Sequence, residues 1–240
     1  MNLLTRYTSA LGRMRRSRGY GIHSPFAFRF VLDVLCERLP YYAFGYIDEL
    51  RRAVVAAVRT GFWRHPRVIS AKNARMLFRI TNYFNPRRIL QVGTSYGVSS
   101  ASMLAVDSRS RLWLYEPALD SYPVVARVLA PYIERVTTGT LLPGLIAEWR
   151  AAPGDDEPFV LVNDLPGGEA DYEAVSALLR DVIDGGGTVV LRNLSREALM
   201  ERLWDNCVAH GDRGQLFTNG KIAVVVASRK LQREVFTLWF

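Results

Sequence analysis

Two glycines and one acidic residue in the middle of the chain have the types and spacing that point most directly to chemistry. Gly93 and Gly97 follow the apolar run Arg88–Val92, and a Ser/Ala-rich segment typical of a helix comes next. Glycines in such a turn let a ligand approach the backbone closely, because no Cβ stands in the way. Glu116 ends the next apolar run, about 20 residues further on, where a carboxylate can accept hydrogen bonds from ribose hydroxyls. The combination predicts a cofactor that carries a ribose.

The spacing of the glycines narrows the kind of cofactor. The dinucleotide fingerprint G-x-G-x-x-G has a glycine where this chain has Ser95, so only Gly93 and Gly97 remain, spaced G-x-x-x-G. A pyrophosphate group is therefore a poor fit. Many α/β domains have a glycine after their first strand and a carboxylate further on, so the spacing alone leaves a purely structural interpretation open.

Length and composition indicate a soluble globular protein. The chain has 240 residues, 49% of them hydrophobic and 22% charged, which is enough for one full domain with a small appendage. No apolar run reaches the roughly 18 residues of a membrane span, and the N-terminus lacks the apolar region of a secretory signal. We therefore expect a cytoplasmic protein. Cys36 and Cys207 lie far apart without a C-x-x-C spacing, which favours buried free thiols.

The net charge of +8 belongs to the first part of the chain. Residues 1–80 contain 15 Lys or Arg against four acids, and residues 1–20 form a basic arm with apolar residues at helical spacing. Such an arm could bind nucleic acid or an anionic membrane surface. Because nearly all basic residues of the chain are arginines, general codon bias explains the charge as well, and we favour a solvated arm.

The remaining residues divide into helices first and alternating strands and helices afterwards. We predict helices from the Ser24 cap to about Leu39, over 47–60, and from the Ser70 cap to Asn85. Residues 1–85 would thus be a helical extension, and 86–240 an α/β domain. The predicted strands are 88–93, 112–116, 134–138, 158–163, 186–192, 214–218 and 221–228, and the predicted helices between them are 97–106, 121–130, 140–150, 169–183 and 195–210.

This order predicts a Rossmann-like, seven-stranded, mostly parallel sheet with an antiparallel last strand and helices on both faces. The antiparallel strand follows from Asn219-Gly220, which separates the last two apolar runs with the chemistry of a type I′ hairpin turn. The strand count, the glycine turn and Glu116 together narrow the fold to few classes.

With these features the chain resembles the class I S-adenosylmethionine-dependent methyltransferases, in a bacterial branch similar to small-molecule O-methyltransferases. The resemblance is carried by Gly21-Ile-His-Ser-Pro-Phe26, by the stretch from Lys72 to Phe84 that leads into Ile89-Leu-Gln-Val-Gly-Thr94, and by Phe236-Thr-Leu-Trp-Phe240. It implies that S-adenosyl-L-methionine is the cofactor and that a small molecule accepts the methyl group. A homodimer also stays open.

The resemblance also implies roles for particular residues. Gly93, Thr94, Ser95 and Gly97 would surround the methionine part of the cofactor, and Glu116 would bind its ribose. The family usually has Glu or Asp where this chain has Gln91, whose amide can still accept a hydrogen bond from the cofactor's ammonium group.

The expected catalytic end departs further from the family pattern. After the fourth strand, either Asn163 or Asp164 holds the position of the family's aspartate, with Asn163 at the cofactor and Asp164 as the candidate base. Where relatives carry an acidic pair after the fifth strand, this chain has Arg192-Asn193, so we predict no metal. His23, ahead of the Ser24 cap, is a second candidate base if the N-terminal helices fold over the cofactor.

Three functions therefore remain. The first is a metal-independent methyltransferase that acts on a small-molecule hydroxyl. The second is a catalytically impaired relative that keeps the fold as a binding or scaffold module, as Gln91, Asn163 and Arg192 suggest. The third is a nucleic-acid methyltransferase that uses the basic arm, although the N-P-P-Y type of motif does not follow the fourth strand.

Overall fold

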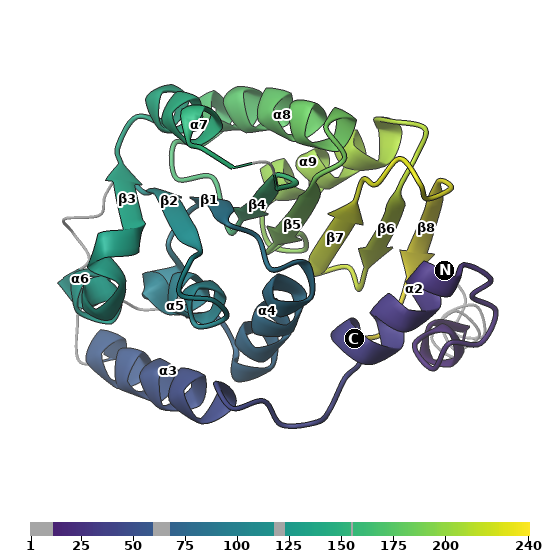
Figure 1. Ribbon diagram of the computed structural model, residues 1–240, viewed down its shortest axis with the longest axis horizontal. Helices are drawn as coiled ribbons and strands as arrows, with labels where there is room; N and C mark the ends of the chain where they lie inside the picture. The colour runs from purple at the N-terminus through teal and green to yellow at the C-terminus, as the bar shows by residue number, and fades with distance from the viewer. Residues whose placement is uncertain (1–11, 60–67, 118–122, 155) are drawn as a thin grey trace.

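An eight-stranded sheet runs through the molecule, and helices cover both of its faces (Figure 1). The computed structural model describes residues 12–59, 68–117, 123–154 and 156–240. The strand order is β3-β2-β1-β4-β5-β7-β6-β8, and only β7 runs antiparallel to its neighbours. The strands are β1 (Arg88–Val92), β2 (Arg111–Tyr115), β3 (Val136–Gly139), β4 (Phe159–Val162), β5 (Thr188–Arg192), β6 (Gln215–Thr218), β7 (Ile222–Val226) and β8 (Glu234–Thr237).

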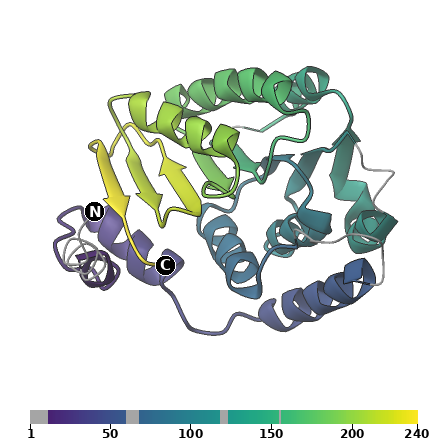
Figure 2. The same cartoon turned by 180° about the vertical axis from the view of Figure 1, so that it is seen from behind.

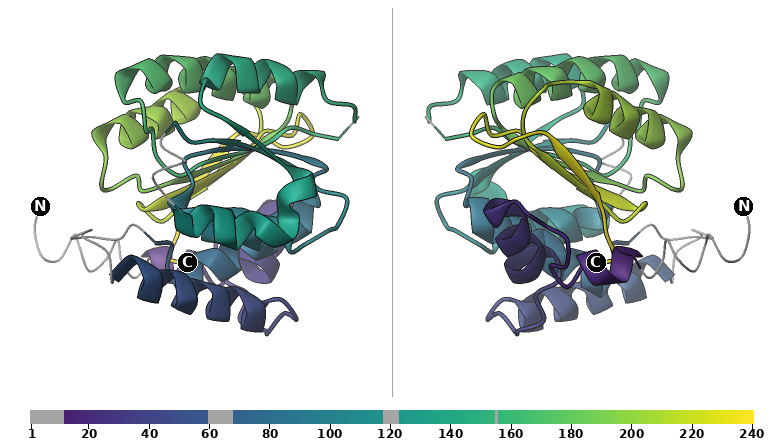
Figure 3. Two further views of the ribbon diagram at one scale, coloured as in Figure 1. Left: turned by 90° about the vertical axis from the view of Figure 1, so that its left-hand side faces the viewer. Right: turned by 90° about the vertical axis from the view of Figure 1, so that its right-hand side faces the viewer.

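The helices form one layer above the sheet and a deeper layer below it (Figures 1 and 3). One face is covered by α7 (Leu142–Ala151), α8 (Glu169–Asp184) and α9 (Ala198–Ala209). The other face carries α4 (Ala71–Phe84), α5 (Val98–Leu104) and α6 (Pro123–Leu129), and α3 (Phe44–Arg59) packs outside these three. The short elements are α2 (Pro25–Phe30), η1 (Val31–Leu35), η2 (Ser95–Gly97) and η4 (Ala130–Arg135).

The apolar strands bury side chains on both faces of the sheet, as parallel strands between two helical layers must. One hydrophobic cluster lies on the side of α7, α8 and α9, and the other on the side of α2 to α6. The N-terminal helices belong to the second cluster, because the Phe30 ring of α2 lies 5.0 Å from the Phe217 ring of β6. Helical extension and sheet thus share one core.

The first predicted helix begins as expected and ends early. The Ser24 hydroxyl accepts a hydrogen bond from the Ala27 N–H at 3.2 Å, with Pro25 at the first helical position. After Phe30 the chain widens into the π-helix Val31–Leu35, which ends at Cys36 instead of near Leu39. At this buried end of the helix, Arg79 of α4 donates to the free carbonyls of Val34 and Leu35 at 2.6 and 3.2 Å.

The C-terminal residues add one strand that the sequence pattern does not predict. Glu234–Thr237 pairs in parallel with β6 and extends the sheet beyond the predicted seven strands. After it, the chain turns below the sheet toward α2, where the Trp239 N–H donates to the Ser17 hydroxyl at 2.7 Å (Figures 1 and 2). The described part of the basic arm, from Gly12 on, is thereby tied to the C-terminal end. The first 11 residues of that arm lie outside the described residues.

The hairpin between β6 and β7 is present, but its predicted type I′ turn is wrong. That turn requires positive φ at both central residues, and in this link only Gly220 has it, at +82°. Instead, the Asn219 carboxamide oxygen accepts hydrogen bonds from the N–H groups of Lys221 and Ile222, both at 2.9 Å. The Asn219 N–H also donates to the Ile222 carbonyl at 3.1 Å, so the backbone and the side chain of Asn219 close the turn together.

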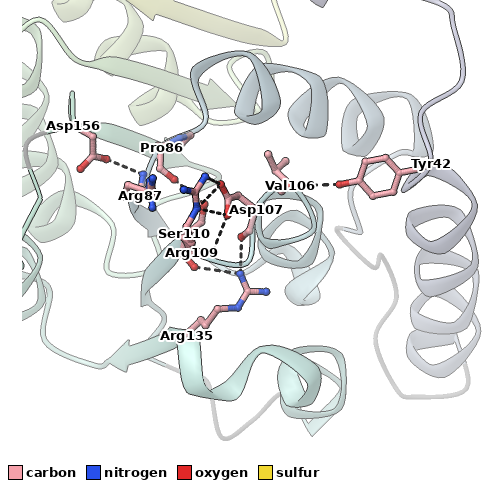
Figure 4. A network of polar contacts seen from close by, with 9 residues as sticks. All are labelled: Tyr42, Pro86, Arg87, Val106, Asp107, Arg109, Ser110, Arg135 and Asp156. Carbon is pink, nitrogen blue, oxygen red and sulfur yellow. Dashed lines mark hydrogen bonds and ion pairs between the residues drawn. The ribbon is translucent and has the colours of Figure 1, made fainter.

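A polar network holds the amino ends of the strands together (Figure 4). Arg135 donates to the backbone carbonyls of Asp107 and Ser110, at 2.8 and 3.3 Å, and Ser110 donates to the Pro86 carbonyl at 2.7 Å. Asp107 accepts hydrogen bonds from the backbone and the guanidinium group of Arg109. These contacts fix the amino-terminal ends of the strands, on the side of the sheet opposite to the carboxyl ends of β1, β2 and β4.

Both cysteines are free, as predicted, with Cys207 buried and Cys36 half-buried. Within the described ranges, no helix is both long and apolar enough to cross a bilayer.

Candidate functional site

The carboxyl ends of β1 and β4 lie where open α/β sheets bind ligands, and we call this place the crevice. The two strands are neighbours, but α5 follows β1 on one face of the sheet and α8 follows β4 on the other. The connections from β1 to α5 and from β4 to α8 therefore diverge at this point, and neither of them covers the strand ends. The glycine turn and the Asn163-Asp164 pair lie at these two ends.

The glycine turn has an unusual backbone. Gly93, Ser95, Tyr96 and Gly97 all have positive φ, between 46° and 79°. Positive φ is costly for Ser95 and Tyr96, and such strain persists only where the surroundings hold it in place. The Thr94 hydroxyl contributes by accepting a hydrogen bond from the Tyr96 N–H at 3.3 Å. The sequence pattern predicts the two glycines but not the two strained residues between them.

Gly93 lies directly against Asp164, so this position tolerates no side chain. A Cβ at Gly93 would collide with the Asp164 carboxylate, with Cγ at 2.8 Å. The Gly93 carbonyl accepts two amide hydrogen bonds, from Gln91 Nε2 at 2.6 Å and from Asn163 Nδ2 at 2.8 Å. Both lone pairs of this carbonyl are therefore used within the protein.

Gln91 is fully buried and has both ends of its amide engaged. Besides its bond to Gly93, its Oε1 accepts a hydrogen bond from the Ser100 hydroxyl at 2.9 Å. In this arrangement Gln91 holds the carbonyl of the glycine turn and the first turns of α5. Its predicted contact with a cofactor stays a prediction.

Glu116 places a buried carboxylate beside the glycine turn. It follows β2, is 7% exposed, and accepts a hydrogen bond from the Thr94 N–H at 3.3 Å. Since β2 and β1 are adjacent parallel strands, their ends bring Glu116 and Thr94 to one side of the crevice. The spacing of about 20 residues predicts this proximity correctly.

On the other side of the crevice, Arg192 is buried against Asn163. Its NH1 donates to Asn163 Oδ1 at 2.5 Å and to the Ser99 hydroxyl at 3.3 Å. Asn193 completes the cluster by donating from Nδ2 to the Asn163 carbonyl at 2.8 Å. Burial lowers the pKa of Arg192 to about 10, and the negative charge of Asp164 opposes that shift. A guanidinium group thus occupies the place where the family resemblance led us to look for acidic residues.

Asp171 and Tyr115, which the sequence pattern did not single out, form a pair that fixes the loop after β4. Asp171, near the start of α8, accepts hydrogen bonds from the Tyr115 hydroxyl at 2.9 Å and from the Gly167 N–H at 2.6 Å. Burial and the Asp171 carboxylate raise the pKa of Tyr115 to about 12. An acidic residue in the first turn of a helix is a known signal for such contacts. Its partner in β2 is too distant in sequence to be found that way.

The structure brings most of the predicted site residues together, with one exception. Gln91, Gly93, Thr94, Glu116, Asn163 and Asp164 lie around one crevice, next to Ser95 and Gly97. His23 is exposed and precedes α2, which packs against β6, and the strands β4, β5 and β7 separate β6 from β1. Among the described residues, no hydrogen bond joins His23 to the crevice.

No group of three or more His, Cys, Asp or Glu side chains in the described ranges could hold a metal ion. Arg192 adds positive charge where a cation would have to bind. The predicted independence of metal stays a prediction.

Comparison with solved structures identifies the fold. The chain matches a Podospora anserina methyltransferase bound to S-adenosylhomocysteine, with 12% identity, a TM-score of 0.54, and coverage of 79% of this chain and 97% of the other. It matches a Bacillus cereus O-methyltransferase in complex with S-adenosylhomocysteine, with 17% identity, a TM-score of 0.55, and coverage of 82% and 96%.

A methyltransferase from Geobacter sulfurreducens gives 15% identity, a TM-score of 0.53, and coverage of 83% and 93%. No family model and no curated protein matches the chain. The predicted fold class is thus confirmed: the chain has the Rossmann-like α/β fold of the class I methyltransferases, with an eighth strand.

Proposed function

We propose that the protein is an S-adenosylmethionine-dependent methyltransferase that acts on a hydroxyl group of a small molecule. The observation that carries the proposal is the buried Glu116 carboxylate beside the glycine turn, at the crevice between β1 and β4. A buried carboxylate at the end of β2 suits a pair of ribose hydroxyls. The solved structures with this fold that contain S-adenosylhomocysteine support the same ligand.

The residues present fit this cofactor. The Asp164 carboxylate takes the place that a Cβ at Gly93 would need, so the absence of a side chain there brings this carboxylate against the glycine turn. Glu116 would accept hydrogen bonds from the ribose hydroxyls, and Thr94, Ser95 and Gly97 would line the methionine part. Asn163 would act by holding the Gly93 carbonyl in place.

When bound, S-adenosylmethionine supplies a methyl group that its sulfonium activates for transfer. The chain's own residues then have two tasks, to orient the acceptor and to receive its proton. Asp164 is the carboxylate at the crevice that would take the proton from the acceptor hydroxyl as the new carbon–oxygen bond forms. The buried Arg192 lies close enough to Asp164 for their opposite charges to attract each other.

Calorimetric titration with S-adenosylhomocysteine tests the cofactor. Glu116→Gln keeps the size of the side chain and removes its charge, so we expect affinity to fall at least tenfold, roughly the worth of one charged hydrogen bond. The matched control is Glu148→Gln on the exposed face of α7, which should leave the affinity unchanged. If the wild-type protein fails to bind at millimolar ligand, the cofactor assignment is wrong.

Transfer of a labelled methyl group to a panel of small hydroxy compounds tests the role of Asp164. Asp164→Asn should lower the rate by about 10²- to 10⁴-fold, the usual contribution of a general base, while S-adenosylhomocysteine still binds. Equal rates for the wild type and this variant would remove Asp164 from the mechanism. His23→Ala is the comparison variant. Because His23 is exposed, we expect this substitution to change the transfer rate little.

A second candidate is a binding or scaffold module that keeps the fold without turnover. The saturated Gly93 carbonyl favours it, because Gln91 and Asn163 already take both of its lone pairs. Tight binding of S-adenosylhomocysteine without transfer to any acceptor would support this alternative. Gln91→Glu would then show whether the missing charge limits the affinity. A nucleic-acid substrate, a homodimer and a cytoplasmic location stay predictions from the sequence.

A further inference from the structure

Three adjoining cavities form a groove that leads away from the crevice, which we call the basic groove. The inner cavity, of 230 Å³, lies at the end of β5, the middle one has 420 Å³, and the outer one has 730 Å³. Lys221 lines both the inner and the middle cavity, and Lys72 and Trp239 line both the middle and the outer one. The groove therefore runs from β5 along the start of α4 to the C-terminal segment.

Basic side chains line the groove over its whole length. They are Arg192, Arg196 and Lys221 in the inner cavity, Arg13, Lys72 and Lys221 in the middle one, and Arg38, Lys72, Arg75 and Arg79 in the outer one. The chain has only three lysines, and two of them lie here. Like charges gathered in one concave surface raise the local concentration of anions.

The two acidic residues of the groove cancel only part of this charge. Glu37 and Asp48 line the outer cavity only. Asp48 forms an ion pair with Arg75, and Glu37 accepts hydrogen bonds from the N–H groups of Arg38 and Leu39 at 2.5 and 2.6 Å. Both carboxylates are thus engaged by neighbours on the protein.

Several cations, in contrast, face the groove without a partner in the part of the chain that the structure describes. No hydrogen bond or ion pair within residues 12–59, 68–117, 123–154 and 156–240 engages the ammonium groups of Lys72 and Lys221. Arg13 Nε is buried and has no partner there either. Arg79, 7% exposed, is held by the carbonyls of Val34 and Leu35, so its guanidinium group is fixed at the wall of the outer cavity. Because such a cation is already held in place, little further conformational entropy is lost when an anion binds to it.

Apolar surface accompanies the charge in the outer cavity. Tyr41, Phe44, Trp239 and Phe240 line it, and Trp239 is 60% exposed. Aromatic side chains of this kind pack against planar or apolar groups. The groove therefore matches a molecule that has negative groups and an apolar body.

The inner end of the groove adjoins the proposed reaction centre. Arg192 and Asn193 line the inner cavity, and both donate hydrogen bonds to Asn163, the residue before Asp164. A ligand that extends through the groove can thus present one end to the residues at which we place methyl transfer.

We propose that the basic groove binds the methyl acceptor and that this acceptor is an elongated organic anion, with phosphate or carboxylate groups and a planar apolar body. The proposal rests on the methyltransferase function proposed above. It assigns Lys72 and Lys221 the recognition of negative charge, and Trp239 the contact with the apolar body.

The test compares charged and neutral probes that share one body. Calorimetry measures the binding of 2-naphthyl phosphate, naphthalene-2-carboxylate and neutral 2-naphthol to the wild-type protein without cofactor. We expect at least one anion to bind tenfold more tightly than 2-naphthol, with affinity that falls as salt rises. The tighter anion shows whether phosphate or carboxylate is preferred. Equal binding of charged and neutral probes would overturn the proposal.

The three lysines provide a matched set of variants. The double variant Lys72→Ala/Lys221→Ala should weaken binding of the preferred anion at least tenfold. Lys230→Ala removes the third lysine, which is exposed between β7 and β8, and should have no effect. Unchanged binding by the double variant would overturn the assignment of the groove. So would tight binding of a 12-nucleotide single-stranded RNA by a protein that binds neither naphthyl anion, because the groove would then serve nucleic acid.

Titration with S-adenosylhomocysteine separates this proposal from the one on which it rests. If S-adenosylhomocysteine binds and the naphthyl anions do not, the acceptor class is wrong while the methyltransferase function stands. If the anions bind and S-adenosylhomocysteine does not, the function has failed, and the groove cannot be called an acceptor site.

Discussion

Gly93, which follows β1, lies directly against Asp164, which follows β4. Its positive φ of 79° and the Asp164 carboxylate beside it both exclude a side chain. The two constraints affect different properties of a substituted protein. Backbone strain lowers the free energy of unfolding at any site, whereas the collision with Asp164 would disturb the crevice and so lower ligand affinity. A pair of substitutions can separate them.

Gly93→Ala should therefore abolish measurable binding of S-adenosylhomocysteine and lower the free energy of unfolding by more than 1 kcal/mol. Gly220→Ala is the matched control, because Gly220 has a similar φ of 82° but no atom within 4 Å of its hypothetical Cβ. It should cost only the backbone strain, about 1 kcal/mol, and leave ligand affinity unchanged. Denaturant unfolding and calorimetry measure the two effects. Full affinity in Gly93→Ala would contradict this account of the turn.

At the scale of residues, the sequence was most informative where chemistry depends on short spacings. Gly93, Gly97 and Glu116 could be placed from their order along the chain, because a strand, a turn and the next strand have predictable geometry. The partners of Arg192 could not, since Asn163 and Ser99 are contributed by other elements. The role of Gln91 also differs from the expected one because its partners, Ser100 and Gly93, become evident only once the turn is folded.

At the scale of elements, the loop between α5 and β2 shows how the amino edge of the sheet is stabilised. The Arg109 guanidinium and N–H beside Asp107 hold the pKa of that carboxyl far below its usual range. Asp107 is therefore ionised in the folded protein at pH values where it would be protonated in the unfolded chain. Its contribution to stability is complete above pH about 4 and is lost as the pH falls further.

Asp107→Asn should accordingly make stability less sensitive to acid. We expect the free energy of unfolding to fall less between pH 5 and pH 3 in this variant than in the wild-type protein. Denaturant titrations at the two pH values measure the difference. Asp212→Asn, at an exposed carboxylate without a hydrogen bond to another described residue, should retain the wild-type dependence on pH. The same slope in wild type and Asp107→Asn would show that the network contributes nothing.

The elements themselves could be located well from apolar runs and caps. The seven predicted strands are all present, and the helix from the Ser70 cap occupies Ala71–Phe84 as expected. The π-helix at Val31–Leu35 could not be predicted, because its early end depends on Arg79, which lies more than 40 residues further along the chain. β8 was missed because an edge strand of four residues, mostly exposed, has no distinct periodicity.

At the scale of the whole molecule, the C-terminal strand joins the sheet to the N-terminal helices. Phe236 of β8 is 3% exposed, and its ring stacks on Phe217 with the centroids 5.1 Å apart. Phe217 in turn contacts Phe30 of α2. The last residues of the chain therefore complete a core that begins with its first helices.

Phe236→Ala should lower the free energy of unfolding by about 3–5 kcal/mol, as removal of a buried aromatic ring usually does. Val235→Ala, next in the same strand but 41% exposed, should cost less than about 1 kcal/mol. Chemical denaturation measures both. If the two variants were equally stable, β8 would not belong to the core.

The contact between Phe30 and Phe217 also has a consequence for synthesis on the ribosome. At about 5–20 residues per second, the residues from α2 to β6 take on the order of ten to forty seconds to translate. During that interval Phe30 can pack on Phe84 of α4, with the ring centroids 5.7 Å apart, but it lacks its partner in β6. The nascent chain thus leaves part of the apolar face of α2 exposed to solvent until β6 emerges, and this is the stage at which a holding chaperone would matter most.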